Sequence, residues 1–425
     1  MKHVCLLCGM MWLAVSAFAQ SLDECRRLAR EHYPEIRQYD LITQTEQYNL
    51  SNATKAWIPQ VTFSGQATYQ SAAPTYPEAF SSMMQANGIH MTGVQKDQYK
   101  VAIDVSQSIW GGGKSKADRA LAEAEAAEQR SRIDVSLYDL QSRIDNIYFG
   151  ILLLEERKAQ AEALITLLES NLSRVQTYFQ NGAAMQADVD MLEAELLTAR
   201  QTLGQVESSR TSYRRMLEIF IGRALTSTQL ERPALKELES RTSARPELAL
   251  FDAQTNKLEA QRKAIHASLM PRFSAFAQGY YGYPGLDMFK SMMSTDWTLN
   301  ALVGLRMSWN IGAFYTKKNN LGKIDIAQKQ IAVGRDIFLF NTEMQTTQED
   351  GEIVRLQKAL EDDSRIVELR QRVRKAAESQ LANGIIDTTD LLHKITDETT
   401  ASLNRSTHEI ELLQAIYKLK TTLNQ

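Results

Sequence analysis

The stretch "LANGIIDTTDLL", residues 381–392, decides how the rest of the sequence is interpreted. Its Asn-Gly pair is a strong signal for a tight turn, and between alternating apolar residues it would predict a β-hairpin. The flanking apolar residues instead follow helical spacing. A second stretch, "FQNGAAMQADVDML" at 179–192, has its Asn-Gly pair 202 residues earlier, and each pair is followed by an aspartate six residues after the glycine. The sequence therefore predicts two tight turns that join helices.

These two turns belong to a longer internal duplication. Three further pairs of stretches match in the same order: "YPEIR" (33–37) with "RPELA" (245–249), "WIPQVTFSGQ" (57–66) with "LMPRFSAFAQ" (269–278), and "VAIDVSQSI" (101–109) with "VGLRMSWNI" (303–311). The pairs keep one order along the chain, so we expect two copies of one structural pattern.

Each copy predicts a helix, two strands, a long helix, a tight turn and a last helix. The first copy, 20–222, has a helix at 20–57, strands at 60–70 and 99–109, a long helix at 114–180, a turn at 181–187 and a helix at 188–222. The second, 245–425, has a helix at 245–269, strands at 272–281 and 298–311, a long helix at 314–382, a turn at 383–387 and a helix at 388–422. Pro59 and Pro271 end the first helix of each copy and mark the start of its first strand. A polar linker, 223–244, joins the copies.

The predicted strands alternate between apolar and polar residues. In 299–311 every odd position is apolar, and polar residues or glycine fill most even positions. Strands of 9 to 13 residues exceed the usual length in soluble proteins. They match the length and the apolar-out, polar-in pattern of transmembrane β-strands. A soluble sandwich strand with one solvated face would show the same alternation, and Phe276 is out of phase.

The long helices carry the heptad spacing of a coiled coil. In the first copy apolar residues follow 3-4 spacing through 140–179, where only Lys158 interrupts, and again through 189–220, where Arg210 interrupts. Two such seams joined by a tight turn predict an antiparallel, left-handed coiled coil. In the second copy the seam is less regular and changes phase, with apolar residues at Ile353, Leu356, Leu360, Ile366, Leu369 and Val373.

The N-terminus predicts export from the cytoplasm. Residues 1–19 combine an early Lys2, an apolar run and a final Ala-Phe-Ala, which is the pattern of a secretory signal peptide. Removal of this segment would leave Cys25 as the only cysteine, so no disulfide can form within the chain. The net charge of -3 over 425 residues gives no indication of a nucleic-acid-binding surface.

Four membrane-type strands cannot stay as an open sheet in lipid, because the edge strands would leave backbone groups without hydrogen bonds. The chain is therefore expected to oligomerise. Two chains would give an eight-stranded barrel filled by its own side chains, and three would give twelve strands with an open lumen. The helices that continue from the strands would form a tube.

At this point the sequence resembles the TolC family of outer-membrane efflux proteins. The resemblance covers nearly the whole mature chain and rests on "SLDECRRLAREHYPEIR" (21–37), the two proline–strand junctions, "SIWGGGK" (108–114) and the two Asn-Gly turns. It implies a mixed α/β membrane protein of the Gram-negative outer membrane: a homotrimer with a 12-stranded barrel and a periplasmic tunnel of antiparallel coiled-coil helices. It further implies a passive export duct without catalytic residues or cofactors, which docks a periplasmic adaptor coupled to an inner-membrane pump.

Two alternatives to a duct for small toxic molecules, in a tripartite efflux or type I secretion system, stay open. The methionines Met83, Met84 and Met91 with His90 in one loop, and Met288, Met292 and Met293 in its counterpart, suit copper or silver export, although packing between loops explains them equally well. A periplasmic coiled-coil protein without a channel would explain the heptads but not the strands.

The resemblance also assigns site residues. Adaptor docking is expected at the two turns, through Asn181, Gly182, Ala183, Asp188, Val189, Asn383, Gly384, Ile385, Asp390 and Leu391. Glycines are expected where the barrel passes into the tunnel, at Gly111, Gly112, Gly113 and Gly312. Family members have a ring of carboxylates that narrows the tunnel and binds cations, and Asp390 matches this position.

Two positions depart from the family pattern near that ring. His393 stands where a second aspartate occurs in the best-known member, and Ile386 stands where that protein has an arginine. A neutral histidine would halve the charge of the ring, and a histidine gains a proton at mildly acidic pH. Opening that depends on pH is therefore a hypothesis for this chain.

Two other patterns bear on function. The stretch "SIWGGGKS" (108–115) follows a strand and begins a helix, as a phosphate-binding loop would, but Ser108 stands where that motif requires glycine. Aromatic residues flank the strands where a membrane-interface girdle is expected, namely Tyr69, Tyr76, Tyr99, Tyr280, Tyr281, Tyr283 and Trp297.

Overall fold

The computed structural model describes residues 20–90, 93–225, 230–234 and 243–424. The predicted signal peptide and Met91 lie outside these ranges, as does much of the predicted linker. In chain order the elements are α1 (Leu22–His32), the 3₁₀ helix η1 (Pro34–Arg37), α2 (Gln38–Lys55), β1 (Gln60–Tyr69), α3 (Glu78–Ala86), β2 (Asp97–Trp110), α4 (Lys114–Gln180), α5 (Gln186–Ile221), α6 (Pro246–Ser268), β3 (Arg272–Tyr283), α7 (Met288–Met293), β4 (Thr298–Ser308), α8 (Ala313–Ala382) and α9 (Thr388–Leu423). Within the described ranges, no helix combines the length and the apolar character that crossing a membrane requires.

Contacts divide the chain into two compact units, and each unit contains parts of both copies of the duplication. The first unit consists of Met1–Tyr39, Ser131–Leu250 and Gly334–Gln425, and the second of Asp40–Arg130 and Phe251–Val333. One copy alone would supply only a two-stranded hairpin, which is marginally stable in water. The two copies therefore fold together rather than as separate repeats.

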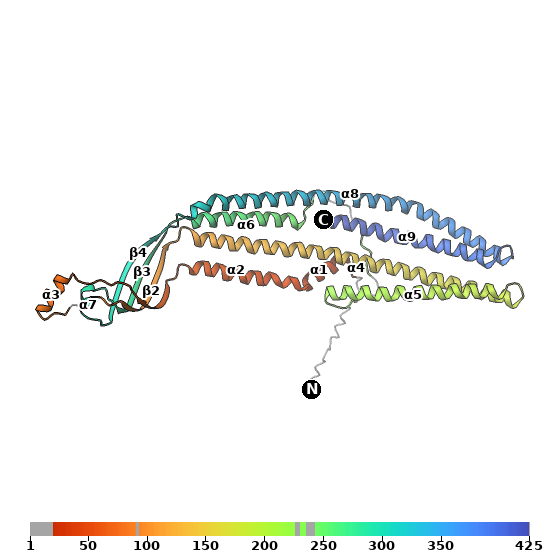
Figure 1. The fold of residues 1–425 in the computed structure, drawn as a ribbon. Coiled ribbons are helices and arrows are strands. Elements are labelled where there is room, and N and C mark those ends of the chain that lie inside the picture. Colours follow the sequence, from red (N-terminus) through yellow and green to blue (C-terminus); the bar gives the residue numbers. More distant parts are fainter. Residues whose placement is uncertain (1–19, 91–92, 226–229, 235–242, 425) are drawn as a thin grey trace, which may run out of the picture. The chain divides into compact units, whose positions relative to one another are not determined.

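The second unit contains all four strands, which form one antiparallel sheet in the order β1-β2-β3-β4 (Figure 1). The central pair, β2 and β3, comes from different copies, and Val105 lies opposite Ala277. Strands β1 and β4 form the two edges, so each has one side without a strand partner within the described chain. The predicted combination of long helices with four strands is confirmed for the single chain.

In the first unit α5 runs back along α4, and α9 runs back along α8 (Figure 1). Lys158 and Arg210, which interrupt the apolar seam of the first copy, each form an ion pair between α4 and α5. The Nζ atom of Lys158 lies 2.7 Å from a carboxylate oxygen of Glu207, and an Nη atom of Arg210 lies 3.2 Å from Glu155. These pairs join positions that face each other in one antiparallel register, so the charges fit the hairpin instead of breaking it.

The seam of α8 differs from the sequence prediction. Instead of changing phase to Ile366, Leu369 and Val373, the helix buries Leu356, Asp363, Val367 and Ala377, and the three predicted residues are exposed. Asp363 can occupy the seam because its carboxylate lies 2.7 Å from Nδ1 of His408 on α9. The apolar stripe of Ile366, Leu369 and Val373 therefore lies on another face of α8.

The helix expected at 20–57 is divided in two. Tyr33 is extended, with φ −61° and ψ 128°, and the chain resumes with η1 at Pro34 before α2 begins. Proline disfavours helical backbone in the residue that precedes it, and it is well placed at the first position of a new helix. Pro34 therefore separates α1 from α2.

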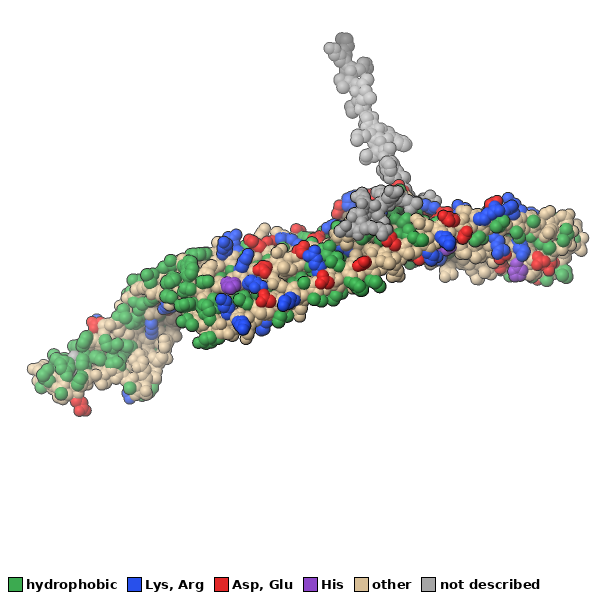
Figure 2. Space-filling model, turned by 90° about the horizontal axis from the view of Figure 1, so that it is seen from above, with side chains coloured by type: hydrophobic (Ala, Val, Ile, Leu, Met, Phe, Trp, Pro, Cys, Tyr) green, Lys and Arg blue, Asp and Glu red, His purple; other side chains and the backbone are tan. Residues whose placement is uncertain are grey.

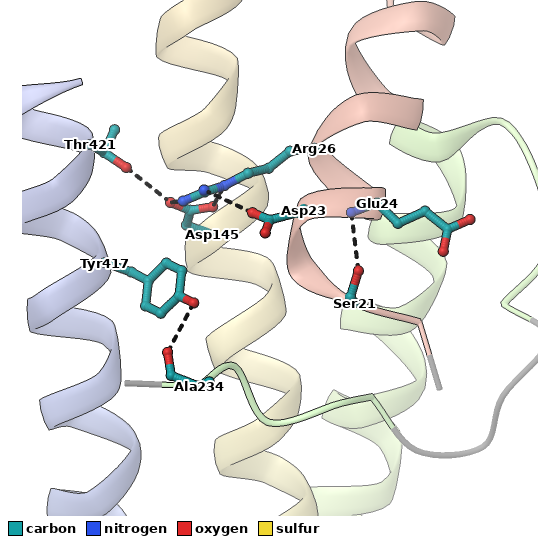
Figure 3. Close-up of polar contacts among 8 residues, drawn as sticks. All are labelled: Ser21, Asp23, Glu24, Arg26, Asp145, Ala234, Tyr417 and Thr421. Atoms are coloured by element: carbon teal, nitrogen blue, oxygen red, sulfur yellow. Dashed lines mark hydrogen bonds and ion pairs between the residues drawn. The ribbon is translucent and has the colours of Figure 1, made fainter. Parts of the chain in front are cut away.

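A buried ion pair joins three helices of the first unit (Figure 3). Arg26 on α1 donates two hydrogen bonds, of 2.7 and 2.6 Å, to the carboxylate of Asp145 on α4, and Thr421 on α9 donates to the same carboxylate. Burial raises the pKa of Asp145, and the hydrogen bond from Arg26 offsets part of that rise. Removal of either charged partner would leave the other one buried and uncompensated.

Candidate functional site

The first Asn-Gly turn closes α4 and leads into α5. Gly182 has φ +72°, in the left-handed region that glycine adopts without a steric penalty. The amide of Ala183 donates a 2.8 Å hydrogen bond to the carbonyl of Tyr178, and the amide of Gly182 donates to Phe179. This pattern satisfies carbonyl groups at the end of a helix and reverses the chain.

The second turn has the same geometry between α8 and α9. Gly384 has φ +68°, and the amide of Ile385 donates a 2.9 Å hydrogen bond to the carbonyl of Gln380. In both turns the asparagine side chain also donates to a carbonyl four residues earlier, over 2.9 Å from Asn181 and 2.8 Å from Asn383. The predicted residues therefore form two equivalent turns.

The helix that follows each turn is capped in a different way. In the first turn the carboxylate of Asp188 accepts a 2.9 Å hydrogen bond from the amide of Met185. In the second, Asp387 is the N-cap, and its carboxylate accepts a 2.8 Å hydrogen bond from the amide of Asp390. The carboxylate of Asp390 has no hydrogen bond or ion pair to any residue that the structure describes.

The two hairpins contact each other near their turns. Val189 is buried in a cluster with Leu168 and Leu192 of the first hairpin, and Leu392 of the second hairpin packs against that cluster. Leu391 is fully buried in a second cluster with Ile395, against which residues of α4 also pack. Of the residues expected to dock an adaptor, Val189 and Leu391 are thus parts of the core, whereas Ala183 and Ile385 are exposed.

The two constriction candidates lie close together on α9. Asp390 and His393 are both exposed and are separated by about one helical turn. No contact in the single chain assigns them to a tunnel, so their role stays a prediction.

The residues predicted at the strand–helix junctions lie between the expected elements. Pro59 and Pro271 immediately precede β1 and β3. Gly112 and Gly113, between β2 and α4, have φ +65° and +82°, and a Cβ atom on Gly112 would lie 2.5 Å from Cβ of Met270. Gly111 belongs to the same turn, and Gly312 immediately precedes α8. Glycine is therefore required at Gly112 both by its backbone and by its neighbour.

The sheet has one apolar and one polar face. Cross-strand register places Phe63 beside Ile103 and Ala277 beside Val303, all on one face, and this face is widely exposed. In Figure 2 hydrophobic side chains gather over the strands, with few charged ones among them. We therefore expect the apolar face to lie against another apolar phase.

The opposite face carries polar side chains that contact each other. Lys100 donates a 2.8 Å hydrogen bond to Gln278, and Gln278 donates in turn to Asp104. Phe276, which is out of phase in the sequence, lies on this face with the guanidinium of Arg306 4.6 Å from its ring centre. A cation above the ring makes this aromatic side chain compatible with a polar face.

Aromatic side chains gather at one end of the sheet, and the methionine-containing loops meet nearby. Trp297 packs on Tyr99 and Tyr281, with ring centres 6.1 and 5.4 Å apart. The ring of Tyr76, in the loop before α3, lies 6.5 Å from Phe289 of α7. The segment that leads into α3, the helix of Met83 and Met84, therefore packs against α7, the helix of Met288, Met292 and Met293.

Across the described ranges, no group of three or more His, Cys, Asp and Glu side chains could hold a metal ion. The "SIWGGGKS" stretch forms the strand-to-helix turn at Gly112.

Two structural features were missed at the level of sequence. The pair of Arg26 and Asp145 has no local signal, because its partners are 119 residues apart. A β-bulge near the end of β2 places Trp110 opposite Phe273, and thus on the apolar face. Strand alternation alone would have put Trp110 on the polar face.

Comparisons with known proteins agree with this geometry. The family model described as outer membrane efflux protein matches residues 26–223. The fold is similar to the outer membrane protein VceC from Vibrio cholerae (14% identity, TM-score 0.66, 95% of this chain and 94% of that chain), to the CmeC outer membrane channel of Campylobacter jejuni (11%, 0.67, 96% and 86%), and to the open state of the MtrE outer membrane channel of Neisseria gonorrhoeae (15%, 0.66, 95% and 88%).

Comparison with curated protein sequences finds no match. The family model covers the first copy of the duplication, and the solved channels share the fold of both copies. Residues 26–223 therefore match the outer membrane efflux protein family, and the chain as a whole shares the fold of solved outer-membrane channels.

Proposed function

We propose that three copies of the chain close a 12-stranded barrel and form a passive export duct for small toxic molecules. The observation that carries this proposal is the sheet. It has two open edges, β1 and β4, and one exposed apolar face. In lipid every backbone group must be hydrogen-bonded, so β1 of one copy would pair with β4 of the next. Twelve strands leave a lumen, which eight strands would fill with side chains.

A second surface supports association through the helices. Ile366, Leu369 and Val373 form an apolar stripe on α8 and are 44%, 43% and 44% exposed. Such a stripe on a long helix is expected to pack against another helix. In the proposed oligomer a neighbouring copy covers it.

Cysteine cross-linking tests the pairing of the edges. The mature chain has one native cysteine, Cys25, which is fully buried, and burial raises the pKa of its thiol to about 12. It will therefore form few cross-links. Gln66→Cys on β1 would be combined in turn with Leu302→Cys, Gly304→Cys and Arg306→Cys on β4.

Under mild oxidation, at least one of these double variants should form disulfide-linked species of up to three chains. The single variant Gln66→Cys should form linked species of no more than two chains. Cross-linking that stops at two chains for every pair would contradict the trimer.

The two turns are the proposed docking site for a periplasmic adaptor. Ile385 is 69% exposed at the second turn, and Ala183 is exposed at the first. A photo-reactive side chain at either position should cross-link to the adaptor in cells. Leu197, which is 53% exposed in the middle of α5, gives the matched control. Equal cross-linking at Leu197 would contradict docking at the turns.

We also propose that Asp390 and His393 narrow the tunnel. The proposal is supported by the free carboxylate of Asp390, which no capping interaction uses, and by the position of both side chains on one exposed part of α9. In a trimer they would form two adjacent rings of three side chains.

A further inference from the structure

A cavity of about 680 Å³ lies in the second unit, where β2 passes into α4. Its walls come from the end of β2, the first turns of α4, the start of β3 and the residues after α2. The residues that matter for its chemistry are Trp57, Trp110, Lys114, Lys116, Arg119 and Arg272. A cavity of this volume is within the range of small-molecule sites.

The charge of the cavity is positive. Four basic side chains face two acidic ones, Asp118 and Glu123, across its walls. The ammonium of Lys114 is paired with Asp118 at 2.8 Å. The side chains of Lys116, Arg119 and Arg272 are exposed and make no hydrogen bond or ion pair with any part of the chain that the structure describes. Three cations are thus available to an anion.

The cavity begins where the apolar face of the sheet ends. Trp110 lies on that face because of the β-bulge, with its ring 5.9 Å from Phe273. Trp57, which also lines the cavity, is 49% exposed. Tryptophan is enriched where a membrane meets water, because its ring is apolar and its N–H is polar.

The aromatic group that includes Tyr99 lies at the other end of the strands, and its distance from Trp110 matches the thickness of a membrane. From Tyr99 to Trp110 the strand advances about 3.3 Å per residue, or roughly 36 Å. A tilt of about 40° reduces this to roughly 28 Å, close to the ~25 Å apolar band of outer-membrane barrels. The cavity is therefore at the depth of lipid headgroups.

We propose that this cavity binds the phosphate-bearing headgroup of an anionic glycerophospholipid, such as phosphatidylglycerol. Lys116, Arg119 and Arg272 contact the phosphate oxygens, and Trp57 and Trp110 pack against the glycerol and the first acyl carbons. Arginine and lysine near a membrane surface attract anionic lipids, and arginine matches the geometry of phosphate. The inference rests on the proposed barrel, because the sheet must span the membrane for the cavity to meet a headgroup.

The test uses the purified full-length oligomer and native mass spectrometry, with phosphatidylglycerol titrated against zwitterionic phosphatidylcholine. The wild-type protein should retain phosphatidylglycerol preferentially. The double variant Lys116→Gln/Arg119→Gln should lower that affinity about tenfold or more, because two cations at the surface are lost. The control variant Lys323→Gln/Lys329→Gln removes the same charge from exposed positions of α8 that lie outside the cavity, and should bind as the wild type does.

Three results would overturn the inference: no preference for phosphatidylglycerol, an equal loss in both double variants, or displacement of the lipid by millimolar inorganic phosphate. The spectra also report the number of chains. A trimer that does not prefer the anionic lipid would contradict this inference alone. A chain that stays monomeric would contradict the proposed function as well.

Discussion

The two Asn-Gly turns have the same backbone but use their aspartates differently. In the first turn Asp188 accepts a hydrogen bond from the amide of Met185 and is therefore part of the cap. In the second turn Asp387 caps the helix, and Asp390, at the same helical position as Asp188, keeps an unused carboxylate. Both copies therefore reverse the chain in the same way, but only the first uses its aspartate six residues after the glycine as part of the cap.

The two turns are stabilised by residues at equivalent positions but differ in the side chains that are available for function. Val189 and Leu391 each follow these aspartates and are buried, so both turns depend on the core beneath them. Only the second turn adds a free carboxylate followed by His393 on the same exposed part of the helix. We infer that the first turn serves mainly as support and docking, and the second also as the constriction.

The largest expected effect is at the core of the second turn. Leu391→Ala removes a fully buried side chain and should cost about 2–5 kcal/mol locally. Amide hydrogen exchange of residues 377–395 should then accelerate about thirtyfold or more. Val189→Ala removes less buried volume at the equivalent position and should have a smaller effect. An equal or larger effect at Val189 would contradict the ranking of the two cores.

The next effect concerns the glycines. Gly384→Val forces a β-branched residue into positive φ, at a cost of about 1–2 kcal/mol. Because a Cβ atom there meets nothing within 4 Å, the cost is conformational rather than a clash. Drug susceptibility of cells should rise while the amount of the protein in the outer membrane is unchanged.

Gly384→Asn is the control for that variant, because asparagine tolerates positive φ. It should retain export, as should the corresponding Gly182→Asn. Full export by Gly384→Val would mean that this turn has no part in docking or opening.

The caps give a third and more selective comparison. Asp188→Ala should cost about 1 kcal/mol, seen as faster exchange of the Met185 amide, whereas Asp390→Ala should leave the cap at Asp387 intact. The effect on the channel should be the reverse. Asp390→Ala should lower its selectivity for cations, and Asp188→Ala should leave that selectivity unchanged. Loss of selectivity in both variants would contradict the division of roles.

The smallest expected effect belongs to His393. A proton on this side chain would place a positive charge beside Asp390 and close to Lys394, and should lower cation conductance. Conductance of the wild type, recorded between about pH 8 and about pH 5, should therefore be lowest at the acidic end. His393→Gln should remove most of this dependence, and an unchanged pH profile in that variant would exclude His393 as its source.

The sequence predicted the features that local patterns and the duplication encode. The Asn-Gly pairs with helical flanks indicated the turns at Gly182 and Gly384, and period-two alternation indicated the strands. Features that depend on distant partners were not accessible. The seam of α8 follows the pairing of Asp363 with His408, 45 residues away, and the position of Trp110 depends on its pairing with β3.

The break between α1 and α2 was ambiguous for a different reason. Proline is tolerated in the first turn of a helix, so Pro34 alone did not decide between one helix and two. The residue before it, Tyr33, had to be seen in its extended conformation. The positions of the two turns were predicted, but the difference in how they cap the next helix was not, because both aspartates look alike in the aligned copies.

The central claim is that copies of this chain form a channel. Single-channel recording in a planar bilayer, on full-length protein whose native mass is measured in the same sample, tests it most directly. We predict discrete conductance steps from a species of three chains. A non-conducting monomer, or a conducting species with a different number of chains, would contradict the account.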